Sequence, residues 1–112
     1  MVMTNERAGS IAGGLAGLDR LLEHRSRLAI CVLLSREPEI SFSRFKTLLG
    51  ESDGNLGAQL RKLEDSGYIK VRKEFMDRKP LSVYSLTPAG RARLTAHLDA
   101  LETMIAAGRT GA

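Results

Sequence analysis

The stretch Ser41–Leu86, SFSRFKTLLGESDGNLGAQLRKLEDSGYIKVRKEFMDRKPLSVYSL, decides the fold of this 112-residue chain. It contains two short segments with apolar residues at helical spacing, separated by a polar turn, and then two alternating segments typical of strands. The residues between the strands are charged and end in Asp77-Arg78-Lys79-Pro80. This order predicts two helices and a cationic β-hairpin, an arrangement that suits entry of the second helix into a DNA groove.

The first of these helices is predicted to start at Ser41 or Ser43 and to stop at Gly50. A serine hydroxyl can cap the first turn of a helix, and glycine readily takes the left-handed conformation that ends one. The apolar residues that we expect to face inward are Phe42, Phe45, Leu48 and Leu49.

The second helix is predicted over residues 53–66. Leu56, Leu60 and Leu63 repeat at helical spacing and should face the core. Steps of about 100° per residue place small and polar residues on the opposite face, where they can approach and pair with base edges. The alternative is an ordinary solvated face. The expected DNA contacts are Ser52, Gly54, Asn55, Ala58, Gln59, Arg61 and Lys62, with Gln59 at the edge of this face.

The hairpin is predicted as two strands, residues 68–74 and 81–86, joined by a charged loop at Phe75–Pro80. From Lys70 to Pro80 five cations stand against two anions, a local charge of +3. We expect Phe75 and Met76 to pack beneath the hairpin; the alternative is contact with the sugar-phosphate chain. Exposed cations can neutralise phosphates, although they also discourage pairing at a sheet edge. The expected phosphate contacts are Arg72, Lys73, Arg78 and Lys79.

Apolar residues recur every three or four positions near both ends of the chain and predict two terminal helices. Three glycines interrupt the first of them, and each lowers helix stability by about 1 kcal/mol, so this helix needs a packing partner. The second begins at Thr87-Pro88, a typical helix start. We expect both helices to form a homodimer interface; the alternative is a monomer that folds both onto its own core. The expected interface residues are Ile11, Leu15, Leu18, Leu22, Leu94, Leu98, Leu101 and Ile105.

The remaining segments complete one domain. A nearly continuous apolar run at residues 28–34 predicts a buried helix that ends at Glu37-Pro38, because the residue before proline avoids helical geometry. Residues 39–41 predict a short strand at the edge of the later hairpin. We expect a flexible tail at residues 1–10, a single domain at 11–107 with dimerisation segments at 11–23 and 88–107, and a frayed end at 108–112.

Composition narrows the function classes. The chain has 17 lysines and arginines against 13 acidic residues, a net charge of +4, which fits a nucleic-acid partner without requiring one. The single cysteine, Cys31, excludes an internal disulfide and is expected to be buried and inert. No apolar run approaches the roughly 20 residues that span a bilayer, and no signal peptide is seen, so a cytoplasmic protein is expected.

Few residues suggest chemistry. His24 and His97 lack neighbours at metal-ligand spacing, and no nucleophile–base or paired-carboxylate pattern occurs. We therefore expect no metal, no cofactor and no enzymatic activity. Arg25 and Arg27 either reach a DNA backbone or are simply solvated.

Several short motifs stand out along the chain: DGNL (53–56), LRKLE (60–64), GYI (67–69) and VYSLTPAGR (83–91). They resemble those of the small winged-helix transcriptional regulators, stand-alone relatives of the MarR and ArsR groups. The resemblance extends from about Leu15 to Leu101. It implies a mainly α fold with a small β-hairpin, a winged helix–turn–helix with N- and C-terminal dimerisation helices. The recognition helix would be Asp53–Ser66 and the wing Phe75–Pro80.

The same resemblance implies a homodimer that binds double-stranded DNA at a (pseudo)palindromic site. The Cys/His ligand set of the ArsR metal sensors is missing, and a small-molecule effector has no marked site. A winged-helix module for protein–protein contact without DNA binding is the alternative, because Glu64 and Asp65 balance the charge of Arg61 and Lys62. RNA binding is less favoured, since no exposed aromatic set offers base stacking.

Overall fold

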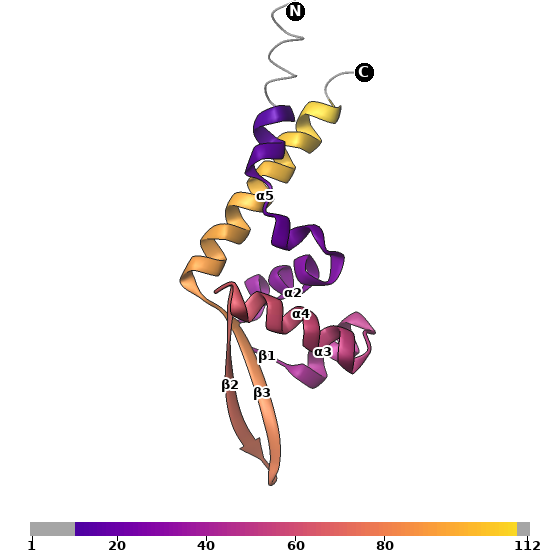
Figure 1. The fold of residues 1–112 in the computed structure, drawn as a ribbon, viewed down its shortest axis with the longest axis vertical. Coiled ribbons are helices and arrows are strands. Elements are labelled where there is room, and N and C mark those ends of the chain that lie inside the picture. The colour runs from indigo at the N-terminus through magenta and orange to yellow at the C-terminus, as the bar shows by residue number, and fades with distance from the viewer. Residues whose placement is uncertain (1–10, 110–112) are drawn as a thin grey trace, which may run out of the picture.

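The computed structural model describes residues 11–109, in which helices pack at the base of one small sheet and a hairpin of that sheet projects away from them (Figure 1). Residues 1–10, predicted as a tail, and residues 110–112 of the predicted frayed end lie outside the described part. The elements are a helix at residues 11–17, the 3-10 helix η1 (Arg20–Glu23), α2 (Arg25–Arg36), β1 (Ile40–Ser41), α3 (Phe42–Leu49), α4 (Asp53–Asp65), β2 (Ile69–Met76), β3 (Lys79–Leu86) and α5 (Pro88–Arg109).

The hydrophobic core gathers side chains from α2, α3, α4, α5 and the sheet. Each core residue is at most 2% exposed, and burial of one large apolar side chain contributes about 1.5–3 kcal/mol. The three leucines predicted to face inward from α4 are all in this core. Its members are Leu22, Ile30, Cys31, Leu34, Ile40, Phe45, Leu56, Leu60, Leu63, Tyr68, Ile69 and Leu94.

The apolar run at residues 28–34 lies in α2, as predicted. The Nδ1 atom of His24 accepts a hydrogen bond from the backbone N–H of Ser26 (3.2 Å) and so caps the helix. The helix ends at the residue before Glu37, next to Pro38. Cys31 is fully buried, and burial raises the pKa of its thiol to about 12, so it stays protonated and unreactive near neutral pH.

Helix α3 begins and ends as its sequence predicts. The hydroxyl of Ser41 accepts from the backbone N–H of Arg44 (3.2 Å), and Gly50 ends the helix with φ +63°. One inward assignment was wrong: Leu48 is 44% exposed. At about 100° per residue Leu48 lies well off the stripe that Phe42, Phe45 and Leu49 share, so it turns to solvent.

The sheet is antiparallel with the strand order β1-β3-β2. The predicted short strand is confirmed, since Ile40 pairs with Tyr84 and Ser41 with Val83. The ring of Phe45 meets the ring of Tyr84 edge-on at 6.1 Å, which ties α3 to the middle strand. The predicted mainly α fold is therefore confirmed, with one strand added to the hairpin.

The turn of the β2–β3 hairpin is shorter than predicted. Instead of a six-residue loop, the strands continue in register to Met76 and from Lys79, leaving a two-residue turn of Asp77 and Arg78. Both turn residues have positive φ, +51° and +65°. Two consecutive positive values are typical of the type I′ turn, whose twist matches that of the paired strands. Because neither residue is glycine, the sequence did not mark this turn.

The predicted N-terminal helix is broken. The helix at residues 11–17 stops before Leu18-Asp19, and η1 follows. The Asp19 carboxylate caps η1 by accepting from the backbone N–H of Leu21 (3.1 Å). This break turns the chain so that Leu22 enters the core rather than continuing the apolar stripe of the helix before it.

Helix α5 starts as predicted and extends beyond the core. The Thr87 hydroxyl accepts from the backbone N–H of Gly90 (2.8 Å), and the helix continues through Gly108 to Arg109. Its C-terminal half lies beside the helix at residues 11–17 (Figure 1). We call these two segments, residues 11–17 and 98–109, the terminal arm.

Close packing within the terminal arm explains two of the N-terminal glycines. A Cβ atom on Gly14 would lie 2.5 Å from Cγ of Met104, and one on Gly17 would lie 3.1 Å from Cβ of Ala100. The absence of these side chains lets the two helices approach. The packing partner that the glycine-rich segment was predicted to need is therefore α5 of the same chain.

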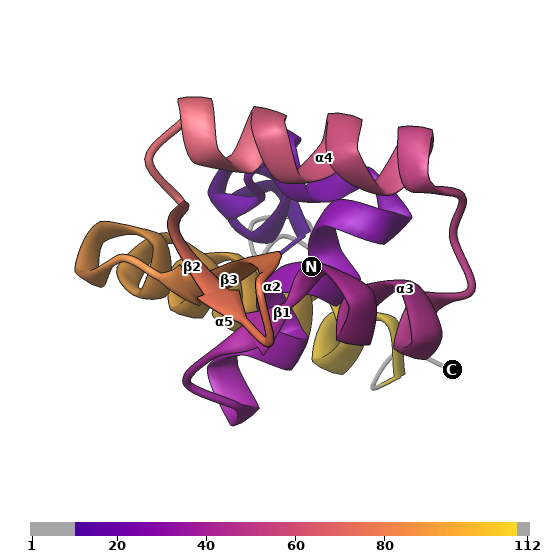
Figure 2. The same ribbon diagram turned by 90° about the horizontal axis from the view of Figure 1, so that it is seen from below.

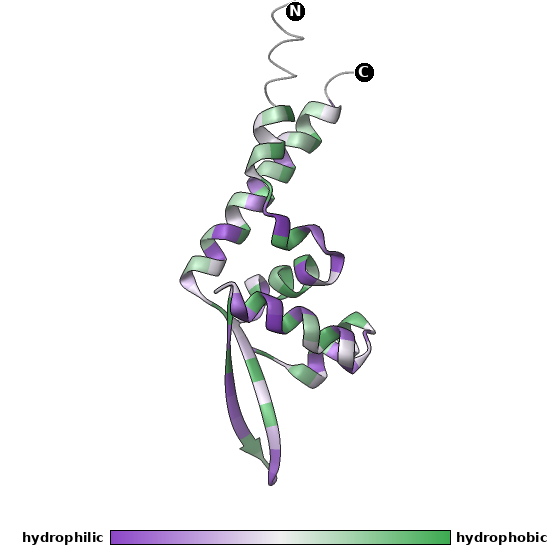
Figure 3. Ribbon diagram, in the orientation of Figure 1, coloured by the Kyte–Doolittle hydropathy of each residue, from purple (hydrophilic) through white to green (hydrophobic). Residues whose placement is uncertain are grey.

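The arm makes the molecule elongated and leaves apolar side chains uncovered. The radius of gyration is 17.2 Å, against roughly 13 Å for a compact chain of this length. Figure 3 shows apolar residues along both helices of the arm. Ile11, Leu15 and Ile105 are 45%, 62% and 51% exposed. By contrast, Leu22 and Leu94 belong to the core, so their prediction as interface residues was wrong. Leu18, Leu98 and Leu101 are half-buried.

Candidate nucleic-acid interface

Helix α4 lies along one edge of the molecule, as the view in Figure 2 shows. The Ser52 hydroxyl caps it by accepting from the backbone N–H of Asn55 (3.2 Å). Opposite the buried leucines, the helix exposes a face with little side-chain bulk at its start and two cations further along. The exposed residues among the predicted DNA contacts are Ser52, Gly54, Ala58, Arg61 and Lys62.

Gln59 does not belong to this exposed face. It is 8% exposed, and its side-chain oxygen accepts from Nη1 of Arg27 (2.6 Å). Its amide nitrogen donates to the side-chain oxygen of Asn55 (3.2 Å). Placing Gln59 at the edge of the outward face was therefore wrong. No local pattern marks the role of Arg27, which approaches from α2 and satisfies the buried amide.

Asn55 is half-buried and engaged at both ends of its amide. Besides accepting from Gln59, it donates to the carboxylate of Glu51, which also accepts from the hydroxyl of Ser26. These hydrogen bonds, that from Ser26 first, lower the pKa of Glu51. A set of hydrogen bonds thus fixes the start of α4 to the start of α2. Asn55 can pair with a base if it gives up one of these internal bonds.

Arg27 is neither a DNA-facing nor a freely solvated residue. In addition to Gln59, it binds the backbone carbonyl of Leu21 through Nε at 2.6 Å. It therefore joins η1, α2 and α4. The sequence around Arg27 could not indicate this joining role, because its partners Leu21 and Gln59 are 6 and 32 positions away.

The hairpin exposes all four of its predicted phosphate contacts. Lys73, Arg78 and Lys79 are exposed, and none of them forms an ion pair within residues 11–109. Arg72 is exposed too, but it is paired with Glu39 and, at 3.1 Å, with Glu74. Within these residues Lys73, Arg78 and Lys79 are therefore uncompensated, as is Lys70, and Arg72 is held to the edge of the sheet.

Phe75 and Met76 do not pack beneath the hairpin as predicted. They are 77% and 61% exposed. The prediction placed them in a loop that could fold back, whereas they end a strand that extends away from the core (Figure 1). No core side chain can reach them there.

These elements, an exposed helix after a short helix and a cationic hairpin after both, match a known family. The sequence model described as winged helix DNA-binding domain matches residues 26–105, most of the chain. The chain belongs to this family. The β2–β3 hairpin is accordingly its wing.

Solved winged-helix proteins share the fold. A transcriptional regulator homologue from Pyrococcus horikoshii OT3 is 27% identical, with a TM-score of 0.77 over 93% of this chain and 98% of that chain. Bacillus subtilis PadR, solved in complex with operator DNA, is also 27% identical, with a TM-score of 0.58 over 64% of this chain and 46% of that chain.

More distant similarity extends over nearly the whole molecule. A mutant form of MarR from E. coli has a TM-score of 0.69 and covers 99% of this chain and 80% of its own. At 15% identity this similarity shows a shared fold, terminal helices included. No curated protein has a sequence that matches this chain significantly.

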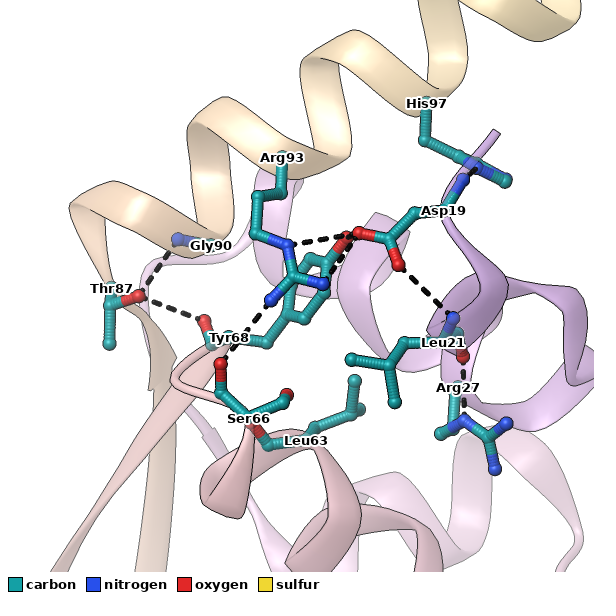
Figure 4. A network of polar contacts seen from close by, with 10 residues as sticks. All are labelled: Asp19, Leu21, Arg27, Leu63, Ser66, Tyr68, Thr87, Gly90, Arg93 and His97. Carbon is teal, nitrogen blue, oxygen red and sulfur yellow. Dashed lines mark hydrogen bonds and ion pairs between the residues drawn. The ribbon is translucent and has the colours of Figure 1, made fainter. Parts of the chain in front are cut away.

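A polar cluster joins η1 and α5 to the segment that follows α4 (Figure 4). The Asp19 carboxylate accepts from the Tyr68 hydroxyl and from Nε of Arg93 (3.0 Å), as well as from Leu21. The guanidinium of Arg93 also lies 4.3 Å from the centre of the Tyr68 ring and donates to the backbone carbonyl of Ser66 (3.3 Å). Asp19 therefore connects η1, α5 and the segment that follows α4.

The surroundings of this cluster favour a charged Asp19. Burial opposes its ionisation, but the hydrogen bonds from Tyr68 and Leu21 and the charge of Arg93 outweigh it and lower the pKa. Burial and the neighbouring carboxylate raise the pKa of Tyr68. The backbone N–H of Asp19 donates to Nδ1 of the buried His97 (2.9 Å). This bond holds the segment between the helix at residues 11–17 and η1 against α5.

Within residues 11–109, no three His, Cys, Asp or Glu side chains gather as a metal site would require. In the same part of the chain, each helix is too short or too polar to cross a bilayer.

Proposed function

We propose that this chain is a transcriptional regulator that binds double-stranded DNA as a homodimer at a (pseudo)palindromic site. The observation that carries the proposal is the exposed face of α4 beside a wing whose Lys73, Arg78 and Lys79 have no anionic partner within the described residues. Membership of a family of DNA-binding domains supports it, and so does the similarity to PadR, which was solved with operator DNA.

In this proposal α4 enters the major groove. Gly54 and Ala58 allow close approach, since a Cβ atom on Gly54 would meet nothing within 4 Å. Arg61 and Lys62 reach guanine edges or phosphates, and Ser52 reaches a phosphate at the helix start. Asn55 contributes after exchanging an internal hydrogen bond for one to a base. Gln59 acts indirectly, by holding Asn55.

The wing holds the backbone beside the groove. Lys73, Arg78 and Lys79 neutralise phosphates, and each contact adds about one to the slope of affinity against salt. Arg72 contributes less, because its guanidinium already binds Glu39 and Glu74.

The terminal arm forms the proposed dimer. Ile11, Leu15 and Ile105 expose apolar surface that a second copy would cover. A two-fold arrangement places two α4 helices about one turn of DNA apart, roughly 34 Å, which matches a palindrome. The half-buried Leu18, Leu98 and Leu101 extend this surface toward the core. A cytoplasmic location and the absence of enzymatic activity stay predictions.

Fluorescence anisotropy on random duplex DNA at low salt tests the function, followed by selection of bound sequences from a random pool. We expect measurable affinity that falls with salt and a selected site with two-fold symmetry. Arg61→Ala should weaken binding to the selected site by about 1–3 kcal/mol and relax preference at one base position.

Arg109→Ala is the matched control, because it removes one charge at the far end of the arm. It should leave base preference unchanged. A wild-type chain that binds no duplex at low salt would instead favour the protein–protein module.

A further inference from the structure

The tip of the wing combines apolar surface with charge. Phe75 is 77% exposed, more than any other large apolar side chain among residues 11–109, and Met76 beside it is 61% exposed. Figure 3 shows this apolar end of β2 after a hydrophilic stretch of the same strand. Cations alone would suffice to hold phosphates. Phosphate binding by the wing therefore does not explain why the Phe75 ring is exposed there.

Strand register shows what surrounds the ring. Phe75 is directly opposite Pro80, and Lys73 lies two residues before it on the same face. Two residues along a strand span about 6.6 Å, so Lys73 and Phe75 are neighbours on this face. Arg78 lies in the turn that follows, whereas Lys79 is opposite Met76 and therefore lies on the other face. Phe75 thus has Lys73 on its own face and Arg78 at the turn.

The rest of the chain does not cover this face. A shallow hollow separates the wing tip from the start of α3, and its lining includes Ser43, Met76 and Leu81. Phe75 does not line it, because the alternation of the strand turns Phe75 to the opposite face from Met76. Phe75 is therefore open to contact with another molecule.

We propose that Phe75 packs, with Pro80, against the deoxyribose rings of the bound DNA, while Lys73 and Arg78 hold the adjoining phosphates. This inference rests on the proposed function. A nucleic-acid strand alternates apolar sugars with anionic phosphates, which complements the alternation of Lys73 and Phe75. The unpaired cations single out this polyanion over an apolar protein surface or a second copy, which would leave them without counter-charges.

The proposed contact has a distinctive dependence on salt. A cation that neutralises a phosphate releases a counterion, and its removal lowers the salt slope by about one. A ring that covers a sugar releases none. Loss of Phe75 should therefore weaken binding equally at every salt concentration, whereas loss of Arg78 should weaken it most at low salt.

The test measures the affinity of the full chain for its selected duplex across a salt series. Phe75→Ala should reduce affinity roughly tenfold with an unchanged slope, since burial of a phenyl group contributes enough for one factor of ten. Phe75→Leu should recover most of the loss. Arg78→Ala provides the contrast, with a slope lower by about one. Thermal unfolding should be the same for all, because these side chains contact no core residue.

Each result decides between the alternatives. Wild-type affinity in Phe75→Ala, while the wild-type chain binds DNA, overturns the sugar contact but leaves the proposed function standing. No binding by the wild-type chain overturns both. A loss whose size depends on the base sequence beneath the wing assigns Phe75 to the bases and overturns the backbone assignment. An equal loss on all flanking sequences supports it.

Discussion

The winged-helix core and the terminal arm differ in how completely they bury their apolar residues. In the core, twelve residues are at most 2% exposed, and Asp19, Tyr68 and Arg93 satisfy one another at its border. In the arm, helices pack through small residues such as Gly14 and Ala100, while Ile11 and Leu15 stay about half exposed or more.

This difference shows that the two regions bury their apolar surface in different ways. The core closes within one chain, so its stability should not depend on protein concentration. The arm leaves one side of two helices open, so its stability should depend on association. We therefore expect substitutions in the two regions to act on different measurements.

The largest effect on the core should come from Gly90→Ala. A Cβ atom at position 90 would lie 2.0 Å from the backbone oxygen of Tyr68, and backbone cannot move aside as a side chain can. We expect a loss of about 3 kcal/mol or more in the free energy of unfolding, measured with denaturant.

Gly57→Ala is the matched control for this change. Position 57 lies inside α4, where a Cβ atom meets nothing within 4 Å. The substitution should therefore raise the free energy of unfolding by up to about 1 kcal/mol. Equal effects of the two substitutions would show that α5 does not pack against the backbone at Tyr68 as described.

An intermediate effect is expected at the border of the two regions, from Asp19→Asn. Loss of the charge weakens the hydrogen bonds that Tyr68 and Arg93 donate to Asp19. The free energy of unfolding should therefore fall by about 2 kcal/mol at pH 7. The lowered pKa of Asp19 means that its contribution is present above its unfolded value near 4 and is lost as the pH falls below it.

Denaturant unfolding at a series of pH values measures this effect. The difference between the wild-type chain and Asp19→Asn should shrink between about pH 5 and about pH 3. A difference that stays constant over this interval would contradict a stabilising charge at Asp19.

The smallest effect on the core should come from Leu15→Glu, which places a charge on the exposed side of the arm. We expect dimerisation to weaken at least tenfold in analytical ultracentrifugation, while unfolding of the core at low concentration stays the same. Leu48→Glu is the control, because Leu48 is similarly exposed but lies on α3. If both variants associate like the wild-type chain, the arm does not form the interface.

The sequence was sufficient where local patterns decide the structure. The leucines of α4, the cap Ser41 and the helix start at Thr87 are all found where their spacing predicts them. In each case the controlling contact lies within a few residues, so periodicity and capping rules apply directly.

It was insufficient where distant residues meet. Gln59 is buried because Arg27 approaches from 32 positions away, and the N-terminal helix breaks because Asp19 finds Tyr68 and Arg93 across the fold. The prediction of the wing turn failed for another reason. Its positive φ values fall on Asp77 and Arg78 rather than on the glycine that normally marks them.

At the wing turn, the residues that suit the backbone geometry best are not those that place a positive charge there. An Asn-Gly pair would adopt the same backbone with less strain, because left-handed geometry disfavours an ordinary side chain by roughly 1–2 kcal/mol. Glycine at position 78 would, however, remove a guanidinium from the outermost point of the fold. Selection for heat resistance alone would replace the arginine, whereas selection for rapid capture of a distant polyanion would restore it.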